Sequence, residues 1–337
     1  MNINFQSRGK KVAVLGSTSF SGSNLVTKLL SLDFQVLGIS RSNENNPIFH
    51  PQFVLNSPSY EFHRLHLVDD LSEILQTIDR FQPEYVVNFA AQGEVASSFQ
   101  FPEYYYRTNA FGIVALVSAL QGRDYLRRYI NISTPEVYGS VESDADEMQS
   151  INPTSPYAAS KASADLYISA ISRNSKFPAV TVRATNVYGP RQQLYRIVPR
   201  TIIRILSGEK LFLDGGGRSV KSYIHIDDVT QGEIDIMLGG RAGEVYHLSP
   251  DGDGIAIRDL VRLICTKMGV NFDDVVEDGP DRQGQDKSYL INSTKARQEF
   301  GWLPIVNIDD GILGVIDWVN HYWEEISNLP RSYEFKI

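Results

Sequence analysis

Apolar residues along the chain fall into short continuous runs, separated by longer segments in which they recur every three or four positions. Runs with the length and composition of buried strands lie at 11–15, 35–39, 85–88, 129–132 and 179–183. Helical spacing of apolar residues is found at 25–32, 104–120 and 157–171. Strands that alternate with helices in this way predict βαβ units. The expected fold class is therefore α/β, with a doubly wound parallel Rossmann sheet covered by helices on both faces.

The pattern loses its regularity after Asn186, where glycines and prolines interrupt the chain more often. Within this part, 223–238 predicts one more strand and helix of the main sheet. We therefore expect two interleaved domains. The Rossmann domain covers 1–186 and about 223–242, and a smaller α/β C-terminal domain for the substrate covers 187–222 and 243–330.

The composition of the 337 residues is that of an ordered globular protein, with 42% hydrophobic and 21% charged residues. A formal net charge of −8 opposes binding to nucleic acid, because such binding depends on a basic surface. Cys265 is the single cysteine, so no intramolecular disulfide forms and a reducing compartment is favoured. No apolar stretch approaches the ~18 residues of a membrane span, and the first residues have no apolar signal region. We therefore expect a cytoplasmic protein without a membrane partner.

The first predicted strand runs into a turn with two glycines and then into a helix. Gly16 permits a sharp turn, and Gly22 lets the start of the helix pack against the strand. The amides at the helix N-terminus then face the pyrophosphate of a dinucleotide. Ser19 occupies the position where a third glycine is expected. The segment therefore predicts a dinucleotide site with one departure from the usual pattern.

The end of the second predicted strand indicates which dinucleotide binds. An acidic residue at this point would hydrogen-bond the ribose 2′-hydroxyl of NAD. The chain has Ser40 and Arg41 there instead, and a guanidinium with neighbouring hydroxyls suits a 2′-phosphate. NADP is therefore the favoured cofactor, with NAD as the alternative.

Tyr157 and Lys161 lie four positions apart in a predicted helix, so they share one face of it. A nearby cation favours the phenolate of a tyrosine, whose free pKa is about 10. Tyr157 is therefore a candidate base near neutral pH. Thr134 and Glu136 follow the strand at 129–132, where strand ends border the ligand crevice of an open α/β sheet. A hydroxyl and a carboxylate would then flank the same substrate.

Taken together, these motifs resemble the nucleotide-sugar 4,6-dehydratases of the dTDP-glucose and GDP-mannose types, which belong to the extended short-chain dehydrogenases. The similarity covers roughly residues 10–325, and the motifs stand in the order of the family. Besides the residues already described, it rests on Asn88–Ala91, Thr108–Asn109, Ser133–Gly139, Asn186–Arg191, His225–Asp228 and Asp281–Asp286.

The resemblance implies a reaction and a role for each catalytic residue. Tyr157 takes the C4 hydroxyl proton while the C4 hydride passes to the nicotinamide, and Lys161 and Thr134 align the phenol. Glu136 takes the C5 proton, the C6 hydroxyl leaves as water, and the hydride returns to C6. The product is a nucleoside-diphosphate 4-keto-6-deoxy sugar. Pro135 stands where the thymidine-diphosphoglucose members have an aspartate acid, so Glu136 is the candidate for base and acid alike.

The resemblance also implies the binding residues, and it implies no metal. The cofactor would be held by Gly16, Ser19, Phe20, Gly22, Ser40, Arg41, Asp69, Ala90, Ala91, Asn109, Tyr157 and Lys161. The substrate would be held by Asn186, Arg191, Lys221 and Arg282. Relatives pair the helices at 104–120 and 157–171 in a dimeric four-helix bundle, and small residues on both helices permit that close approach. A homodimer is therefore expected.

Two other kinds of function stay open at this point. A nucleotide-sugar 4-epimerase, a 5,6-dehydratase or a C4 oxidoreductase would share the fold and the Tyr157/Lys161 pair. A C4 epimerase has no need of a base at C5, so Glu136 favours the dehydratase over it. A cofactor-loaded regulatory protein without turnover would predict a damaged Tyr157/Lys161 pair, and here the pair is intact.

Overall fold

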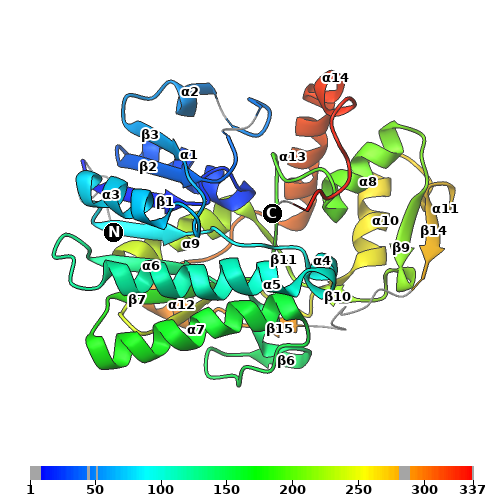
Figure 1. Cartoon of the computed structure of the whole chain (residues 1–337). Coiled ribbons are helices and arrows are strands. Elements are labelled where there is room, and N and C mark those ends of the chain that lie inside the picture. The colour runs from blue at the N-terminus through cyan, green and yellow to red at the C-terminus, as the bar shows by residue number, and fades with distance from the viewer. Residues whose placement is uncertain (1–8, 44–45, 51, 281–288, 336–337) are drawn as a thin grey trace.

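The computed structural model describes residues 9–43, 46–50, 52–280 and 289–335. At its centre lies a seven-stranded parallel sheet with the strand order β12-β7-β5-β4-β1-β2-β3 (Figure 1). The strands are β1 (Lys11–Leu15), β2 (Gln35–Ser40), β3 (Tyr60–Arg64), β4 (Tyr85–Asn88), β5 (Arg128–Ile132), β7 (Ala179–Ala184) and β12 (Val245–Leu248). The doubly wound α/β class predicted from the sequence is confirmed.

Helices cover both faces of the sheet because successive strand residues point to opposite sides. Val12 and Val14 of β1 belong to a core with α1 (Phe20–Ser31) and α9 (Ile226–Gly239). Ala13 and Leu15 belong to a second core on the other face. That core is completed by α3 (Leu71–Phe81), α6 (Ile113–Leu120) and α7 (Pro156–Ser175). Burial on both faces explains why this strand is a continuous apolar run.

Several elements differ from the sequence prediction. The strand expected near 223 is β11 (Tyr223–His225), but it pairs with β8 (Asn186–Tyr188) outside the main sheet. The seventh strand of the main sheet is β12 instead, which pairs with β7. The edge strand β3 has no counterpart in the predicted pattern, because polar and aromatic residues alternate along it. The helix expected at 104–120 divides into α5 (Pro102–Tyr105), the π-helix η2 (Tyr106–Gly112) and α6.

A second lobe stands beside the sheet, on the right in Figure 1. Its core packs α8 (Ile197–Leu206), α10 (Ile257–Lys267) and α13 (Ile308–His321) against one another. Its short elements are β9 (Leu211–Asp214), η4 (Gly215–Gly217), β10 (Val220–Lys221), β13 (Ile255–Ala256), α11 (Phe272–Val275), β14 (Val276–Gly279) and α14 (Trp323–Ile326). Within the described ranges, no helix is both long enough and apolar enough to cross a membrane.

Further short elements lie in the connections. They are α2 (Gln52–Leu55), α4 (Val95–Gln100), η3 (Pro135–Tyr138), β6 (Val141–Ala145), β15 (Tyr289–Ile291) and α12 (Thr294–Phe300). The 3-10 helix η3 follows β5 directly and therefore stands at the carboxyl end of the sheet, where the predicted catalytic residues lie.

A buried polar network holds α7 against the sheet. Asp165 of α7 accepts hydrogen bonds from Asn131 (2.8 Å), Ser133 (2.6 Å) and Arg183 (2.7 Å). Asp165 and Arg183 form an ion pair whose side chains are each only 3% exposed. Since a buried charge is costly without partners, these contacts fix α7 in one position relative to β5 and β7.

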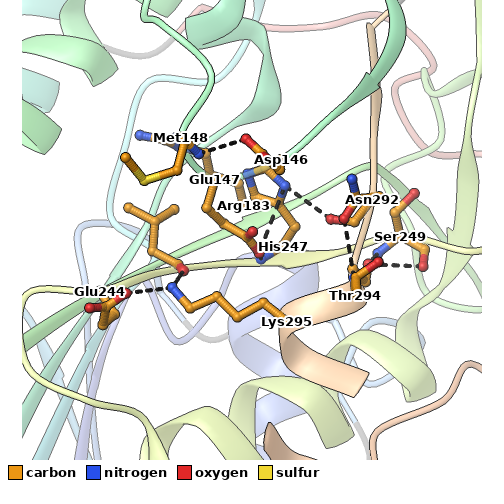
Figure 2. A network of polar contacts seen from close by, with 12 residues as sticks. Asp146, Glu147, Met148, Arg183, Glu244, His247, Ser249, Asn292, Thr294 and Lys295 are labelled. Carbon is orange, nitrogen blue, oxygen red and sulfur yellow. Dashed lines mark hydrogen bonds and ion pairs between the residues drawn. The ribbon is translucent and has the colours of Figure 1, made fainter. Parts of the chain in front are cut away.

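The network continues from Arg183 to β12. Arg183 donates a hydrogen bond to the hydroxyl of Tyr138, which lies 2.7 Å from Nε2 of His247. On the other side of the ring, Nδ1 of His247 lies 3.1 Å from the carbonyl oxygen of Asn292 (Figure 2). Glu147 accepts a hydrogen bond from the backbone N–H of His247 (3.1 Å). The side chain of His247 is therefore held in a fully buried polar site.

Candidate active site

A large cavity opens at the carboxyl ends of the sheet strands. Residues that follow β1, β2, β4, β5 and β7 line one side, and residues of α8 and α10 line the other. Its volume is about 1440 Å³, which exceeds the ~300–1,000 Å³ of a site for one drug-sized ligand. The cavity therefore has room for a dinucleotide and a second ligand. Ligands of open α/β sheets bind at this edge.

The turn after β1 is built for close backbone approach. Gly16 has φ +77°, and a Cβ there would lie 2.7 Å from the backbone nitrogen of Ala90. A Cβ on Gly22 would clash with the carbonyl oxygen of Gly16. Ser19 is the N-cap of α1, and its hydroxyl accepts a hydrogen bond from the backbone N–H of Gly22 (3.1 Å). Ser19, at the position of the third glycine, therefore has a structural role, because it caps the helix.

The N-terminus of α1 fits an anionic group. Ser19, Phe20 and Ser21 line the cavity there, and the first turn of the helix contains no acidic residue. The N-terminal amides and the positive end of the helix dipole favour a phosphate at such a position. The residues of this turn therefore fit the pyrophosphate of a dinucleotide.

The end of β2 presents hydroxyls and a cation. The backbone N–H and the hydroxyl of Thr18 both donate to the hydroxyl oxygen of Ser40 (3.2 and 2.9 Å). Arg41 donates to the side-chain oxygen of Gln92 (3.3 Å). Burial lowers the pKa of the Arg41 guanidinium. Ser40, Arg41 and Gln92 all line the cavity, so the predicted cofactor end of β2 lies where the sequence places it.

The predicted cofactor residues do not all reach the cavity wall. Those that line it are Gly16, Ser19, Phe20, Ser40, Arg41, Ala90, Ala91, Tyr157 and Lys161. Asn109 lies behind the wall, fully buried, where it accepts from the backbone N–H of Gln92 (2.8 Å) and donates to its carbonyl (3.0 Å). Asp69 lines a smaller hollow together with Arg41 and pairs with Arg107. Asn109 therefore positions a wall residue.

The four predicted catalytic residues meet at one wall of the cavity. Thr134, Glu136, Tyr157 and Lys161 all line it. Thr134 is the N-cap of η3 and accepts from the backbone N–H of Glu136 (3.3 Å), and its side chain hydrogen-bonds Tyr157. The Lys161 ammonium donates to the carbonyl oxygen of Ile132 (2.7 Å). The strand-end and helix-face arguments from the sequence converge on this geometry.

The pKa values of Tyr157 and Lys161 differ from the sequence expectation. Burial, followed by the negative charge of Glu136, raises the pKa of the Tyr157 phenol. Burial lowers the pKa of the Lys161 ammonium to about 8, and the Asp165 carboxylate opposes that change. Tyr157 therefore keeps its proton at neutral pH in the protein alone. The lowering expected from Lys161 is not found, because burial and the negative charge of Glu136 outweigh the groups that lower the pKa of Tyr157, which are Thr134 and Arg196.

The predicted substrate residues lie in different surroundings. Asn186 and Lys221 line the cavity, and Lys221 is only 7% exposed. Arg191 is not among the lining residues and lies with His50 and Asp227, while burial lowers its pKa. Arg282 lies outside the described residues. Of the three predicted substrate residues that the structure describes, it brings Asn186 and Lys221 to the cavity.

Gln92 and Arg196 are among the lining residues that the sequence prediction missed. Gln92 follows Ala90 and Ala91 at the end of β4, so the strand-end argument could have found it. Arg196 lies just before α8, and its charge lowers the pKa of Tyr157. Arg196 lies 3.7 Å from Glu94 in an ion pair. No local pattern connects Arg196 with Tyr157, because the two meet only through the tertiary fold.

A parallel Rossmann sheet with a glycine turn, a Tyr/Lys pair on one helix face and a carboxylate at the adjacent strand end defines an enzyme of the extended short-chain dehydrogenase class. More narrowly, the chain belongs to the GDP-mannose 4,6-dehydratase family, whose model matches residues 14–314. The resemblance found in the sequence is confirmed.

Individual relatives extend this result over nearly the whole chain. A dTDP-glucose 4,6-dehydratase from Streptomyces niveus is 31% identical over 95% of this chain and 96% of its own length. The crystal structure of a dTDP-glucose 4,6-dehydratase from Streptomyces venezuelae with NAD bound has a TM-score of 0.86 at 28% identity, covering 94% of this chain and 98% of that one. A UDP-glucose 4-epimerase from Thermotoga maritima has a TM-score of 0.84 at 26% identity, covering 93% and 99%.

Proposed function

We propose that this chain is an NAD(P)-dependent nucleotide-sugar 4,6-dehydratase, a lyase that forms a nucleoside-diphosphate 4-keto-6-deoxy sugar. The observation that carries this proposal is the pairing of Glu136 with Tyr157 at one wall of the cavity. After burial, the Glu136 charge is the next largest cause of the raised pKa of Tyr157, so the two groups are close. The reaction needs one base for the C4 hydroxyl and another for the C5 proton.

Tyr157 and Glu136 each accept one proton in the proposed reaction. Tyr157 first releases its own proton to solvent and then, as the phenolate, takes the proton of the C4 hydroxyl, with Thr134 hydrogen-bonded to its oxygen. When bound, the oxidised nicotinamide supplies a positive charge and a store for the hydride taken from C4 and returned to C6. Glu136 takes the C5 proton, which the C4 ketone has made acidic, and the bond from C6 to its hydroxyl breaks with release of water.

Glu136 also has to assist the leaving hydroxyl. Pro135 is buried at the first position of η3 and has no proton to donate. Glu136, one position later, acquires the C5 proton in the preceding step and faces the same cavity. Passing that proton to the C6 hydroxyl balances the elimination, because Glu136 loses as water forms the proton that it gained. When the hydride returns to C6, C5 takes a new proton that reaches it from solvent through Glu136.

A nucleotide-sugar 4-epimerase is the second candidate, favoured by the fold it shares with the Thermotoga maritima enzyme. The two functions separate in one experiment. The purified protein is incubated with a panel of nucleoside-diphosphate hexoses, and products are followed by mass spectrometry. Loss of one water supports the dehydratase. A product of unchanged mass with inverted C4 supports the epimerase and contradicts the proposal.

The dinucleotide is proposed to be NADP. β2 ends at Ser40 and is followed by Arg41 and Ser42, without a carboxylate at this point. Arg41 and Arg64 line the hollow beside it, together with Asp69 and Asp70. Two guanidiniums suit a 2′-phosphate. The Streptomyces venezuelae relative has NAD bound, so the choice needs a direct measurement. Denaturing the purified protein and identifying the released dinucleotide provides it, and release of NAD alone would contradict the NADP assignment without touching the reaction.

For the substrate, we propose that Asn186, Lys221 and Arg282 hold the diphosphate, whereas Arg191 does not line the cavity. Lys221 offers a point charge where a guanidinium would grip two oxygens. We assign residues 1–186 and about 223–242 to the cofactor domain, and residues 187–222 and 243–330 to the sugar-nucleotide domain. Within the second range, β12 belongs to the cofactor domain, because it pairs with β7 of the main sheet. We further propose a cytoplasmic location, since the free, buried thiol of Cys265 fits a reducing compartment. We also propose a homodimer, because the large apolar side chains of Phe111 and Leu166 are exposed on neighbouring helices.

A further inference from the structure

The last described residues of the chain form part of the cavity wall. After α14 the chain turns back and runs between the two lobes, as the red segment in Figure 1 shows. Residues 329–334 line the same cavity as the catalytic residues. We call residues 329–335 the C-terminal strap. Its contacts at both ends and in its middle indicate what it does.

One end of the strap is tied to the second lobe. Arg331 donates to the hydroxyl of Ser207 (2.9 Å) and to the Glu209 carboxylate (3.1 Å), both just beyond α8. A further bond joins Arg331 to the carbonyl oxygen of Ser327 (3.1 Å). Three acceptors on one guanidinium hold this end firmly.

The other end is tied to the helices that follow β4. The Phe335 ring stacks on Phe101 with centroids 4.6 Å apart and an interplanar angle of 17°. It also stacks on Tyr105 at 6.3 Å and meets the edge of Tyr104 at 5.6 Å. Aromatic pairs of this geometry are favourable beyond the area they bury. The strap thus spans from α8 in the second lobe to α4 and α5 beside the sheet.

The middle of the strap lies over the cofactor side of the cavity. The Tyr333 hydroxyl hydrogen-bonds Tyr105, and the Tyr333 ring meets Tyr195 at 5.4 Å. Tyr333 also interacts electrostatically with Arg41, which follows β2. Tyr105 in turn meets the edge of the Tyr157 ring at 6.4 Å. Tyr333 therefore lies between the end of β2 and the catalytic phenol.

We propose that the C-terminal strap retains the dinucleotide in its crevice from one turnover to the next. The inference rests on the proposed function, in which the hydride is taken and returned at one site. Such a reaction does not require the dinucleotide to leave, so a strap across the crevice does not slow the cycle. Release of the dinucleotide requires the Phe335 stack to open, and the strap therefore acts on the dissociation rate.

A chase experiment on the holoenzyme tests the proposal. Purified protein with its bound dinucleotide is mixed with an excess of the isotope-labelled form of that dinucleotide, and exchange is followed by mass spectrometry. Phe335→Ala should speed release on the order of tenfold, the scale on which loss of an aromatic anchor acts. A chain ending at Leu329 should release it faster still. Phe212→Ala is the matched control, since Phe212 is 57% exposed on β9 and does not line the cavity.

Several results would overturn the proposal. Unchanged release in folded Phe335→Ala and in the shortened chain would do so. Slower release would mean that the strap competes with the dinucleotide. Unchanged release with a raised KM for the sugar nucleotide would place the strap on the substrate side. The chase needs no turnover, so it tests retention of the dinucleotide even if the chain does not catalyse the proposed dehydration. If the shortened chain does not fold, Phe335→Ala still tests the strap.

Discussion

At the scale of single residues, the proposed base Tyr157 and its neighbour Lys161 are arranged differently from the simple picture of a phenol beside an ammonium. Lys161 donates to the Ile132 carbonyl, while Glu136 and burial keep the proton on Tyr157. The neighbouring Arg196 lowers the pKa of the phenol. In the proposed reaction, the remaining positive charge arrives with the oxidised nicotinamide. Without cofactor or substrate, the proposed base Tyr157 therefore carries a proton at neutral pH.

Replacing Tyr157 by Phe tests the base directly. The ring keeps its edge contact with Tyr105, but the proton acceptor is lost, so the rate of C4 oxidation should fall by at least about 10²-fold. The measurement is kcat with the accepted sugar nucleotide, on protein whose fold is checked by circular dichroism. Tyr167→Phe, on the same helix but bonded to Ser118, is the control and should keep its activity. Near-normal turnover by folded Tyr157→Phe would exclude this residue as the base.

Replacing Glu136 by Gln separates oxidation from elimination. The amide keeps the size of the side chain but does not take the C5 proton. The variant should still oxidise C4, so the absorbance of reduced nicotinamide should rise and persist while no water is lost. In deuterated water, the unaltered protein should place deuterium at C5 of its product. Product that keeps its C6 oxygen and has no deuterium at C5 would favour a C4 oxidoreductase or epimerase.

The sequence is informative about residues at strand ends and on helix faces, because their positions follow from local geometry. Gly16, Ser40, Thr134 and Tyr157 belong to this group, and all four line the cavity. Residues that reach the site from distant segments have no local pattern from which their position could be predicted. Arg196 stands before α8, and the strap follows the last helix, so only tertiary packing brings them to Tyr157 and Arg41.

At the scale of elements, those with a local sequence pattern are predicted, and those that depend on distant partners are not. β1 and β4 are predicted residue for residue, since a strand buried on both faces leaves a continuous apolar run. β3 escapes prediction because an edge strand needs no such run. β11 and β12 both have strand composition, but which of them extends the main sheet depends on pairing partners far along the chain. The π-helix η2 has no periodic signal of its own.

The buried network makes the stability of the fold sensitive to acid through His247 of β12. His247 is fully buried, and burial, with help from Arg183 and Lys295, lowers its pKa to about 3. The unfolded chain protonates this ring near pH 6.5. Stability is therefore complete above about pH 6.5 and is lost as the pH falls toward 3, by up to about 1.4 kcal/mol per pH unit from this group.

His247→Asn should flatten that slope. Its amide can still donate to the Asn292 carbonyl, but it does not titrate, so the free energy of unfolding should fall less steeply between pH 6.5 and 4 than in the unaltered protein. Denaturant unfolding at several pH values gives the measurement. His321→Asn, at an exposed site on α13, is the control and should leave the slope as it was. An unchanged slope in His247→Asn would show that other groups dominate.

At the scale of the whole molecule, the proposed dimer follows from two adjacent helices. The π-helix η2 and α7 pack together, and Phe111 and Leu166 on them are 60% and 58% exposed. Exposed large apolar side chains on neighbouring helices are typical of an interface. Leu166→Asp should convert dimer to monomer in light scattering after size exclusion. Leu303→Asp, equally exposed but outside these helices, should leave the mass unchanged. A monomer in the unaltered protein would refute the dimer.

The strap also has a practical consequence for handling the protein. Since residues 329–334 form part of the cavity wall, a peptide fused directly after the strap would start only a few positions from the cavity. An affinity tag in that place would pull on the Phe335 stack or shield the opening. Recombinant preparations for enzymology should therefore carry their tag at the opposite terminus.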